Sequence, residues 1–397
     1  DLTGAGLAFR LATALLARRA AAAVDLAALA AIGTIADLAP MTGECRAIVR
    51  LGLSELAITQ HPGLRGLVAR AAEDPGRPSA RDVGFGIVPR LNAAGRIAEA
   101  ELALDLLVEG NPTAAEARLV ELEEVHVRRR ELTTIAIDTG RRLAAEASAA
   151  SDTGPLALRH DDWPPGLLGL VAGRLADELA RPVAAAALLE YEIRGSVRAT
   201  PDFHVSLGLE ACATHLTKRG GHAAAGGFSA VPDAWDAFAA AFAQLPRPYP
   251  PATADEVARP GQLTVDLVLS ARHVGWPLLD ELSRLAPFGP GHEQPILAVT
   301  GMTVGSSRRV GADADHLSMR LRRRAETIDA IAFGVAADHQ TPPDGAAIDV
   351  VGYLQARTFE GEPRLELRVL DYATSDASPL VGRRRVEPVT EPVAALG

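Results

Sequence analysis

The sequence has little cysteine, few aromatic residues and no long apolar run. Its two cysteines, Cys45 and Cys212, are far apart and share no metal-ligand spacing, which excludes a disulfide-rich secreted fold and favours a reducing cytoplasm. No apolar stretch reaches the roughly 18–20 residues that a membrane-spanning helix needs. We find no signal peptide and expect a cytoplasmic protein that makes no membrane contact.

Composition places the chain among globular proteins. Hydrophobic residues make up 48% of the 397 residues and charged residues 23%, and this length suffices for two or three domains with their own cores. The net charge of −10 excludes a protein coated in basic charge. It leaves open a local basic groove for nucleic acid, because such binding needs no basic total.

Apolar periodicity predicts an α/β multi-domain protein. Helical spacing is predicted over 3–22, 25–32, 44–57 and 113–149, with a small-residue turn at 33–40 and a Gly/Pro-punctuated segment at 82–97. After residue 151, short β-like runs (156–159, 182–189, 193–198, 225–229) alternate with helical patterns (166–180, 205–218, 232–244). From about residue 260, strands are predicted at 262–269, 295–304, 315–322, 327–333, 347–356 and 363–370, with one helix near 277–285. This last region is typical of a small β-barrel such as the OB-fold.

One segment, 220–228, combines four glycines, three alanines and a single histidine. Gly220 and Gly221 allow close approach of the backbone to another surface, and His222 is the one side chain there that can donate a hydrogen bond or share a proton. The segment is either a phosphate-binding loop or a tight turn leading into a strand.

Asp37 is the one carboxylate of the small-residue turn at 33–40. It can cap a helix or serve as one ligand of a hard divalent cation. A cation site needs several ligands, so any partners of Asp37 lie elsewhere in the protein.

Asn92 and Arg96 are four residues apart, with small residues between them. On one helical face they could bind a phosphate, Arg96 through a bidentate contact and Asn92 through a further hydrogen bond. The alternative is a structural salt bridge beside a helix-capping asparagine.

Ser196 and Arg198 alternate in a predicted strand and therefore face the same side, where a hydroxyl beside a guanidinium suits a phosphodiester. Gly195 and Val197 would then point into the core. Trp163, just before the helix predicted at 166–180, either packs in the core or stacks on a base.

Basic residues gather on what would be adjacent strands of the barrel. They could track a nucleic-acid backbone, or they could form an ordinary solvated strand face. The residues are Arg308, Arg309, His316, Arg320, Arg322, Arg323 and Arg324.

Six segments, taken in order, resemble RecJ, a family of bacterial single-strand-specific DNA exonucleases within the DHH phosphoesterase superfamily. The resemblance covers nearly the whole chain, and the segment at 89–96 (PRLNAAGR) is its most specific signal. The segments are 33–37 (GTIAD), 89–96 (PRLNAAGR), 163–172 (WPPGLLGLVA), 194–198 (RGSVR), 220–222 (GGH) and 285–291 (LAPFGPG).

The chain also departs from the family pattern. Pro164 stands where the family has histidine, and His126 and His292 stand where it has asparagine. The Asp-His-His motif that names the superfamily is missing and, by the resemblance, would precede residue 1. We therefore expect an N-terminally truncated chain that is inactive as it stands.

The resemblance implies five regions. They are the C-terminal part of a DHH domain (1–112), a connecting helix (113–150), a mixed α/β DHH-associated domain (151–250), an OB-fold nucleic-acid-binding domain (256–374) and a tail (375–397).

The resemblance also implies a reaction, 5′-to-3′ hydrolysis of single-stranded DNA in repair and recombination, with two Mn²⁺ or Mg²⁺ ions. Asp37 would be a metal ligand, and DNA would be guided by Arg308, Arg309 and Arg320. Phosphate would be held by Asn92, Arg96, Ser196, Arg198, Gly220, Gly221 and His222. A single-strand-binding protein and a recombination helicase are implied partners.

Two alternatives stay open. One is a non-catalytic single-strand-binding module. The other is a DHH-family phosphodiesterase for small oligonucleotides or cyclic dinucleotides, which would gain support if the region after 260 were not a barrel.

Overall fold

The structure is a computed structural model that describes residues 2–16, 26–148, 154–250, 263–311, 314–323, 326–335, 341–359 and 362–375. The end of the helix predicted at 3–22, Arg324 and nearly all of the predicted tail at 375–397 lie outside these residues. The chain divides into two compact units, one of 55–260 and one of 1–54 with 261–397. No helix in the described ranges combines the length and the apolar character that crossing a bilayer requires.

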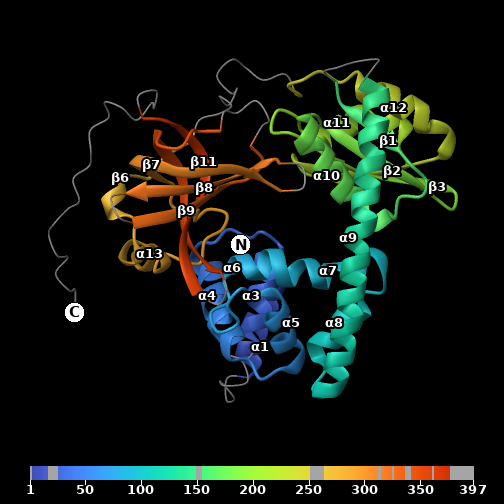
Figure 1. Cartoon of the computed structure of the whole chain (residues 1–397). Helices are drawn as coiled ribbons and strands as arrows, with labels where there is room; N and C mark the ends of the chain where they lie inside the picture. The colour runs from blue at the N-terminus through green and yellow to red at the C-terminus, as the bar shows by residue number, and fades with distance from the viewer. Residues whose placement is uncertain are drawn as a thin grey trace. The chain divides into compact units, whose positions relative to one another are not determined.

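The unit of residues 55–260, called the second unit below, begins with packed helices and ends in an α/β sheet. One long helix runs through both parts (Figure 1). The helices before the sheet are α5 (Pro62–Ala71), α6 (Ala80–Asp82), α7 (Val88–Ile97), α8 (Glu101–Val108) and α9 (Pro112–Ser148). Helix α9 begins where Asn111 Oδ1 accepts the N–H groups of Thr113 and Ala114, at 2.9 and 3.1 Å. Its 37 residues span about 55 Å, and the helix predicted at 113–149 is confirmed.

The segment at 82–97 is helical throughout, which the glycines and proline of its sequence did not predict. Ser79 and Asp82 form a capping box that starts the run, and a π-helical turn at Val83–Ile87 leads into α7. Pro89 lies in the first turn of α7, where a missing N–H is tolerated.

A five-stranded sheet of order β1-β2-β3-β5-β4 forms the rest of this unit. Only the β1–β2 pair is parallel. The strands are β1 (Leu156–Arg159), β2 (Val183–Leu189), β3 (Glu192–Arg198), β4 (Lys218–Gly221) and β5 (Ala225–Ala230). One face packs on α9 and α10 (Leu168–Leu179), and the other on α11 (Val205–Ala211) and α12 (Trp235–Ala243).

Three sequence predictions in this region are corrected or decided. The helix predicted at 205–218 ends at Ala211, and the chain enters edge strand β4 at Lys218. The segment at 220–228 is therefore part of a β-hairpin and not a free loop. Trp163 is buried in the core beneath α10, so it is not available for base stacking.

The other unit contains the first helices and the barrel. Its elements before the barrel are α1 (Gly4–Leu15), α3 (Ala27–Ala36), α4 (Gly43–Ile58), β6 (Leu267–Ser270) and α13 (Trp276–Ser283). The turn predicted at 33–40 begins only at Asp37, because α3 continues to Ala36. Strand β6 is shorter than the prediction of 262–269.

Five strands close into a barrel, in the order β7-β8-β9-β11-β10 and back to β7. They are β7 (Leu297–Val310), β8 (His316–Arg323), β9 (Glu326–Ala332), β10 (Ala347–Phe359) and β11 (Glu362–Thr374). The β9–β11 pair is parallel and the other pairs of the ring are antiparallel. This is an OB-fold barrel, as predicted. A region after residue 260 that was not a barrel would have supported a small-oligonucleotide phosphodiesterase. The described residues of that region form a barrel, so this support is missing.

Candidate phosphate-binding site

Arg96, near the end of α7, joins the helical part of the second unit to its sheet part. Its Nη1 donates to the carbonyl oxygen of Gly166 at 2.8 Å. The segments are so close that a Cβ at Gly166 would lie 2.2 Å from the backbone oxygen of Arg96. Arg96 is thus held at the start of the Pro165–Leu167 turn that precedes α10.

Asn92 lies one helical turn before Arg96, so the two side chains share a face of α7. Asn92 is exposed, lies within α7 and is not a cap. Its side chain has no polar partner among the described residues. The alternative for Arg96 was a structural salt bridge, but in the structure it is Arg90 that forms one. Arg90 donates two hydrogen bonds to the Glu123 carboxylate of α9, at 2.8 and 3.2 Å. Arg96 makes no ion pair among the described residues, so the part of its guanidinium group that does not contact Gly166 can bind an anion.

Ser196 and Arg198 lie on the face of β3 that α10 covers, whereas Gly195 and Val197 face the opposite core, as the alternation predicted. Arg198 Nη1 donates to Ser196 Oγ at 2.9 Å. A Cβ at Gly169, in the first turn of α10, would lie 3.0 Å from Arg198 Nη2 and 3.3 Å from Ser196 Oγ. The absence of a side chain at Gly169 thus lets α10 pack closely against this pair.

The glycine-rich hairpin lies beside Ser196 and Arg198 in the sheet, as their cross-strand neighbour. Gly227 pairs with Ser196 on one side and with Gly220 on the other. Ala225 pairs with Arg198, and its carbonyl oxygen accepts the N–H of His222 at 2.8 Å. Gly221 has φ +148°, and a Cβ there would lie 2.4 Å from the Ala225 oxygen, so the turn requires glycine.

His222 is exposed, and within the described ranges its side chain has no polar partner. Its backbone N–H is used by the hairpin, so a cradle of free N–H groups does not form at this residue. The His222 imidazole is therefore the group of the hairpin turn that can form a hydrogen bond with a ligand. A hollow of about 490 Å³ beside Ser196 is lined by glycines and by basic residues of β3 and β4.

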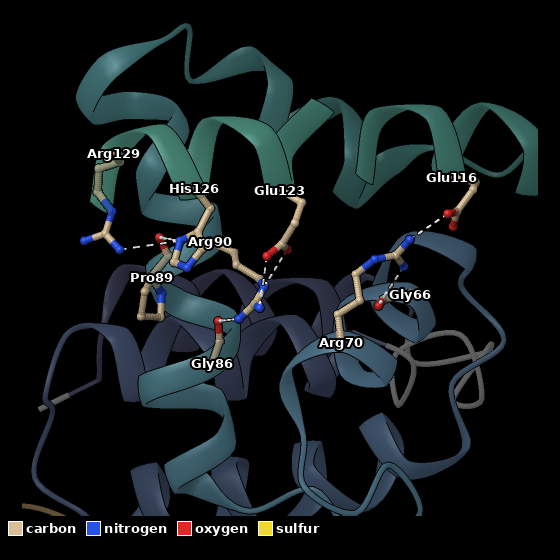
Figure 2. A network of polar contacts seen from close by, with 9 residues as sticks. All are labelled: Gly66, Arg70, Gly86, Pro89, Arg90, Glu116, Glu123, His126 and Arg129. Carbon is tan, nitrogen blue, oxygen red and sulfur yellow. Dashed lines mark hydrogen bonds and ion pairs between the residues drawn. The ribbon is translucent and has the colours of Figure 1, made fainter. Parts of the chain in front are cut away.

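Arg129 is a site residue that sequence reasoning missed. It lies near the middle of α9, close to His126, with 3.5 Å between its Nη2 and His126 Nδ1 (Figure 2). Its Nε is buried and has no hydrogen-bond partner. In the sequence Arg129 is one of three consecutive arginines in a highly charged helix, and no local signal separates it from its exposed neighbours.

Arg96 lies near both Arg129 and Arg198, and its positive charge repels theirs. Burial lowers the pKa of each, and the positive charge of Arg96 lowers the pKa of Arg129 and Arg198 further. No carboxylate of the described residues lies within ion-pair distance of these three guanidinium groups. A cluster of like charges without counter-ions is a candidate anion site.

His126 lies at the edge of this cluster. Burial lowers the pKa of the His126 imidazole, and the charges of Arg129 and Arg90 lower it further, so the ring is neutral at pH 7. Its Nδ1 is also 3.3 Å from the Pro89 oxygen, so α7, His126 and Arg129 are in contact (Figure 2).

Asp37 belongs to the unit of residues 1–54 and 261–397. The described residues do not assemble a metal site around it. It is exposed and follows the last residue of α3, where its N–H donates to the Gly33 oxygen at 3.1 Å. No group of three or more His, Cys, Asp or Glu residues that could hold a metal ion occurs in the described ranges. The residues present do not by themselves fit a two-metal centre.

Arg308 and Arg320 line one groove on the outer face of the barrel, of about 470 Å³. Arg320 is 3.6 Å from Asp329 of the neighbouring strand, whereas Arg308 is exposed without an ion pair among the described residues. Arg309 turns to the opposite face and donates to the carbonyl oxygens of Ala314 and Val335, at 3.3 and 3.2 Å. The structure therefore separates Arg309 from Arg308 and Arg320, the two residues with which it was predicted to guide DNA.

Comparisons with known proteins agree with this architecture. Residues 152–246 match the family described as the DHHA1 domain, and residues 265–371 match the RecJ OB domain. The single-stranded-DNA-specific exonuclease RecJ of Bacillus subtilis is 30% identical over 382 residues, covering 95% of this chain and 47% of that protein. The Thermus thermophilus protein of the same name is 32% identical over 381 residues, covering 94% and 52%.

The solved structures of Thermus thermophilus RecJ with Mn²⁺ and with Mg²⁺ superimpose with TM-scores of 0.70 and 0.69, each at 29% identity over 88% of this chain. They extend further, since the chain covers 50% and 52% of them. The chain thus spans about half the length of the relatives it matches. The shared domains, their order and the superposition of the fold together place this chain in the RecJ family.

Proposed function

We propose that this chain is the strand-holding part of an exonuclease that hydrolyses single-stranded DNA, and that Arg96, Arg129 and Arg198 bind a phosphate of the strand. Two observations carry the proposal: Arg96 lies near enough to Arg129 and to Arg198 for its charge to lower the pKa of each, and none of the three has a carboxylate partner among the described residues. A phosphodiester supplies the missing negative charge, and guanidinium groups match its geometry.

The remaining site residues surround that phosphate with neutral donors and open space. Ser196 Oγ is oriented by its bond to Arg198, and the side chains of Asn92 and His222 are free to donate. Gly220 and Gly221 carry no side chain that would block the strand. The relatives named as RecJ exonucleases act on single-stranded DNA, which is the substrate class we assign to this site.

The barrel supplies a second contact surface. Arg308 and Arg320 line its outer groove and would guide the backbone of the strand, because OB-folds bind oligonucleotides on this face. Arg309 is better explained as a structural residue. A single-strand-binding protein and a recombination helicase remain partners proposed on the family resemblance alone.

The metal requirement rests on the RecJ structures that contain Mn²⁺ and Mg²⁺. Such ions act as Lewis acids and generate a nucleophilic hydroxide from bound water. We assign Asp37 as one ligand. The described residues provide no second and third ligand beside it.

Fluorescence anisotropy with a labelled 20-nucleotide single strand and the matching duplex tests the proposal. The chain should bind the single strand, with affinity falling steeply as salt rises. Arg198→Ala should weaken binding by about tenfold, the loss of one charge-assisted hydrogen bond. The control Arg174→Ala removes an exposed arginine of α10 that pairs with Glu178, and should have no effect. Equal affinities of wild type and Arg198→Ala would contradict the proposed phosphate site.

A further inference from the structure

Phe333 directly follows β9 on the outer face of the barrel, and 53% of it is exposed. Among the phenylalanines that the structure describes, only Phe85 and Phe333 belong to the exposed large hydrophobic residues. An exposed aromatic ring in a fixed position is a candidate contact for a ligand with an apolar face.

The position of Phe333 is fixed by bonds from the residues after it. The N–H of Gly334 donates to His316 Nδ1 at 3.3 Å, and the N–H of Val335 donates to the Asp315 oxygen at 2.7 Å. Arg309 holds the carbonyl oxygen of Val335. Before Phe333, Ala332 pairs with Leu317, so the chain on both sides of Phe333 is tied to the start of β8.

Two side chains set the orientation of the Phe333 ring. His316 meets it edge to face, with 5.1 Å between ring centroids and an angle of 73°. The Arg368 guanidinium carbon lies 5.8 Å from the centre of the Phe333 ring. Arg368 pairs with Ile331 across β9 and β11, and Ile331 precedes Phe333 by two residues, so both side chains lie on the outer face.

The same face carries the basic groove. Arg308, Ser318 and Ile331 form one cross-strand row, and Arg320 and Asp329 form the next. The arginines outnumber the carboxylates, which gives the face a positive surplus suited to a phosphate backbone. The charged residues are Arg308, Arg320, Arg357, Arg364 and Arg368, with Asp329 and Glu366.

We propose that Phe333 is the platform on which an unpaired base of the bound DNA strand stacks, while the phosphates beside that base lie on the arginines of the same barrel face. This inference rests on the proposed function, because it takes single-stranded DNA as the ligand. Every base offers a π-face, so such a platform holds a strand without reading its sequence.

The experiment uses the whole 397-residue chain and two labelled oligonucleotides of equal length, one of thymidine nucleotides and one abasic strand with the same phosphates. Phe333→Leu should weaken binding of the thymidine strand by about tenfold and leave the abasic strand unchanged. Phe333→Trp should restore affinity, because it restores the aromatic face.

The matched control is Phe85→Leu. Phe85 is 80% exposed, and the guanidinium carbon of Arg81 lies 5.5 Å from its ring centre. Phe85 belongs to the second unit and not to the barrel. This variant should bind both strands like the wild type. Thermal unfolding of each variant checks that the fold is intact.

Three outcomes would overturn the inference. In the first, Phe333→Leu binds the thymidine strand as tightly as the wild type. In the second, it loses affinity equally for both strands, and this result would assign Phe333 to the fold or to phosphate binding. If the wild type binds neither strand, the proposed function itself fails, and this inference with it.

Discussion

Arg96 and Gly166 join two parts of the proposed phosphate site: the guanidinium of Arg96 donates to the Gly166 oxygen, and the absence of a side chain at Gly166 allows this approach. The contact joins α7 to the turn before α10. It thereby brings an arginine of the helical part next to Arg198 of the sheet.

Gly166→Ala should destabilise this contact and weaken DNA binding together. Its Cβ would meet the Arg96 backbone at 2.2 to 2.8 Å, and backbone atoms cannot move aside as a flexible side chain can. We expect a loss of about 1–3 kcal/mol in the free energy of unfolding, measured by urea denaturation. Gly110→Ala is the control, since nothing lies within 4 Å of a Cβ there. Identical losses in both variants would contradict the close-approach explanation.

Arg129→Gln should lower affinity for single-stranded DNA by about tenfold and reduce the salt dependence of binding. The substitution removes one positive charge from a cluster of like charges, so the stability of the protein should not fall. Arg128→Gln is the matched control on the same helix, because Arg128 is exposed and pairs with Glu131 at 3.3 Å. An Arg129 variant that binds like Arg128→Gln would remove Arg129 from the site.

His126→Asn should reduce the loss of stability on acidification. In the folded state the pKa of His126 lies below its ordinary value of 6.5, through burial and the charges of Arg129 and Arg90. The unfolded state therefore binds the proton first, and folding stability falls with decreasing pH below about 6.5, with a limiting slope of about 1.4 kcal/mol per pH unit.

Above that pH His126 contributes no pH dependence. Urea unfolding between pH 5 and pH 8 should give a flatter profile for His126→Asn than for wild type. Parallel profiles for wild type and His126→Asn would show that the imidazole does not titrate as expected.

The purified chain with Mn²⁺ should bind single-stranded DNA without degrading it, because the described residues contain no group of three His, Cys, Asp or Glu residues that could hold a metal ion. Gel analysis of a labelled strand measures this directly. Asp37→Asn should leave binding unchanged, since the residue takes no part in the phosphate site. Robust Mn²⁺-dependent degradation by the wild-type chain would refute the expectation.

Periodicity and punctuation were sufficient for much of the fold. The 37-residue helix α9, the alternation of Ser196 and Arg198 in β3 and the strands of the barrel were all readable, because each depends on residues close in the sequence. The predictions that were wrong concern segments where small residues carry little periodic signal. The end of α3 at Ala36 and the strand β4 at Lys218 are examples.

The sequence by itself determined most of the candidate phosphate-binding residues, though not Arg129, because guanidinium groups, hydroxyl groups and glycine-rich segments can be recognised from the local sequence. Only the tertiary structure decided which of them meet. It brought Arg129 to Arg96, separated Arg309 from Arg308 and placed Phe333 beside Arg368. The physical reason is that like charges, partner carboxylates and exposed rings act through space, over distances that packing sets between residues far apart in the chain.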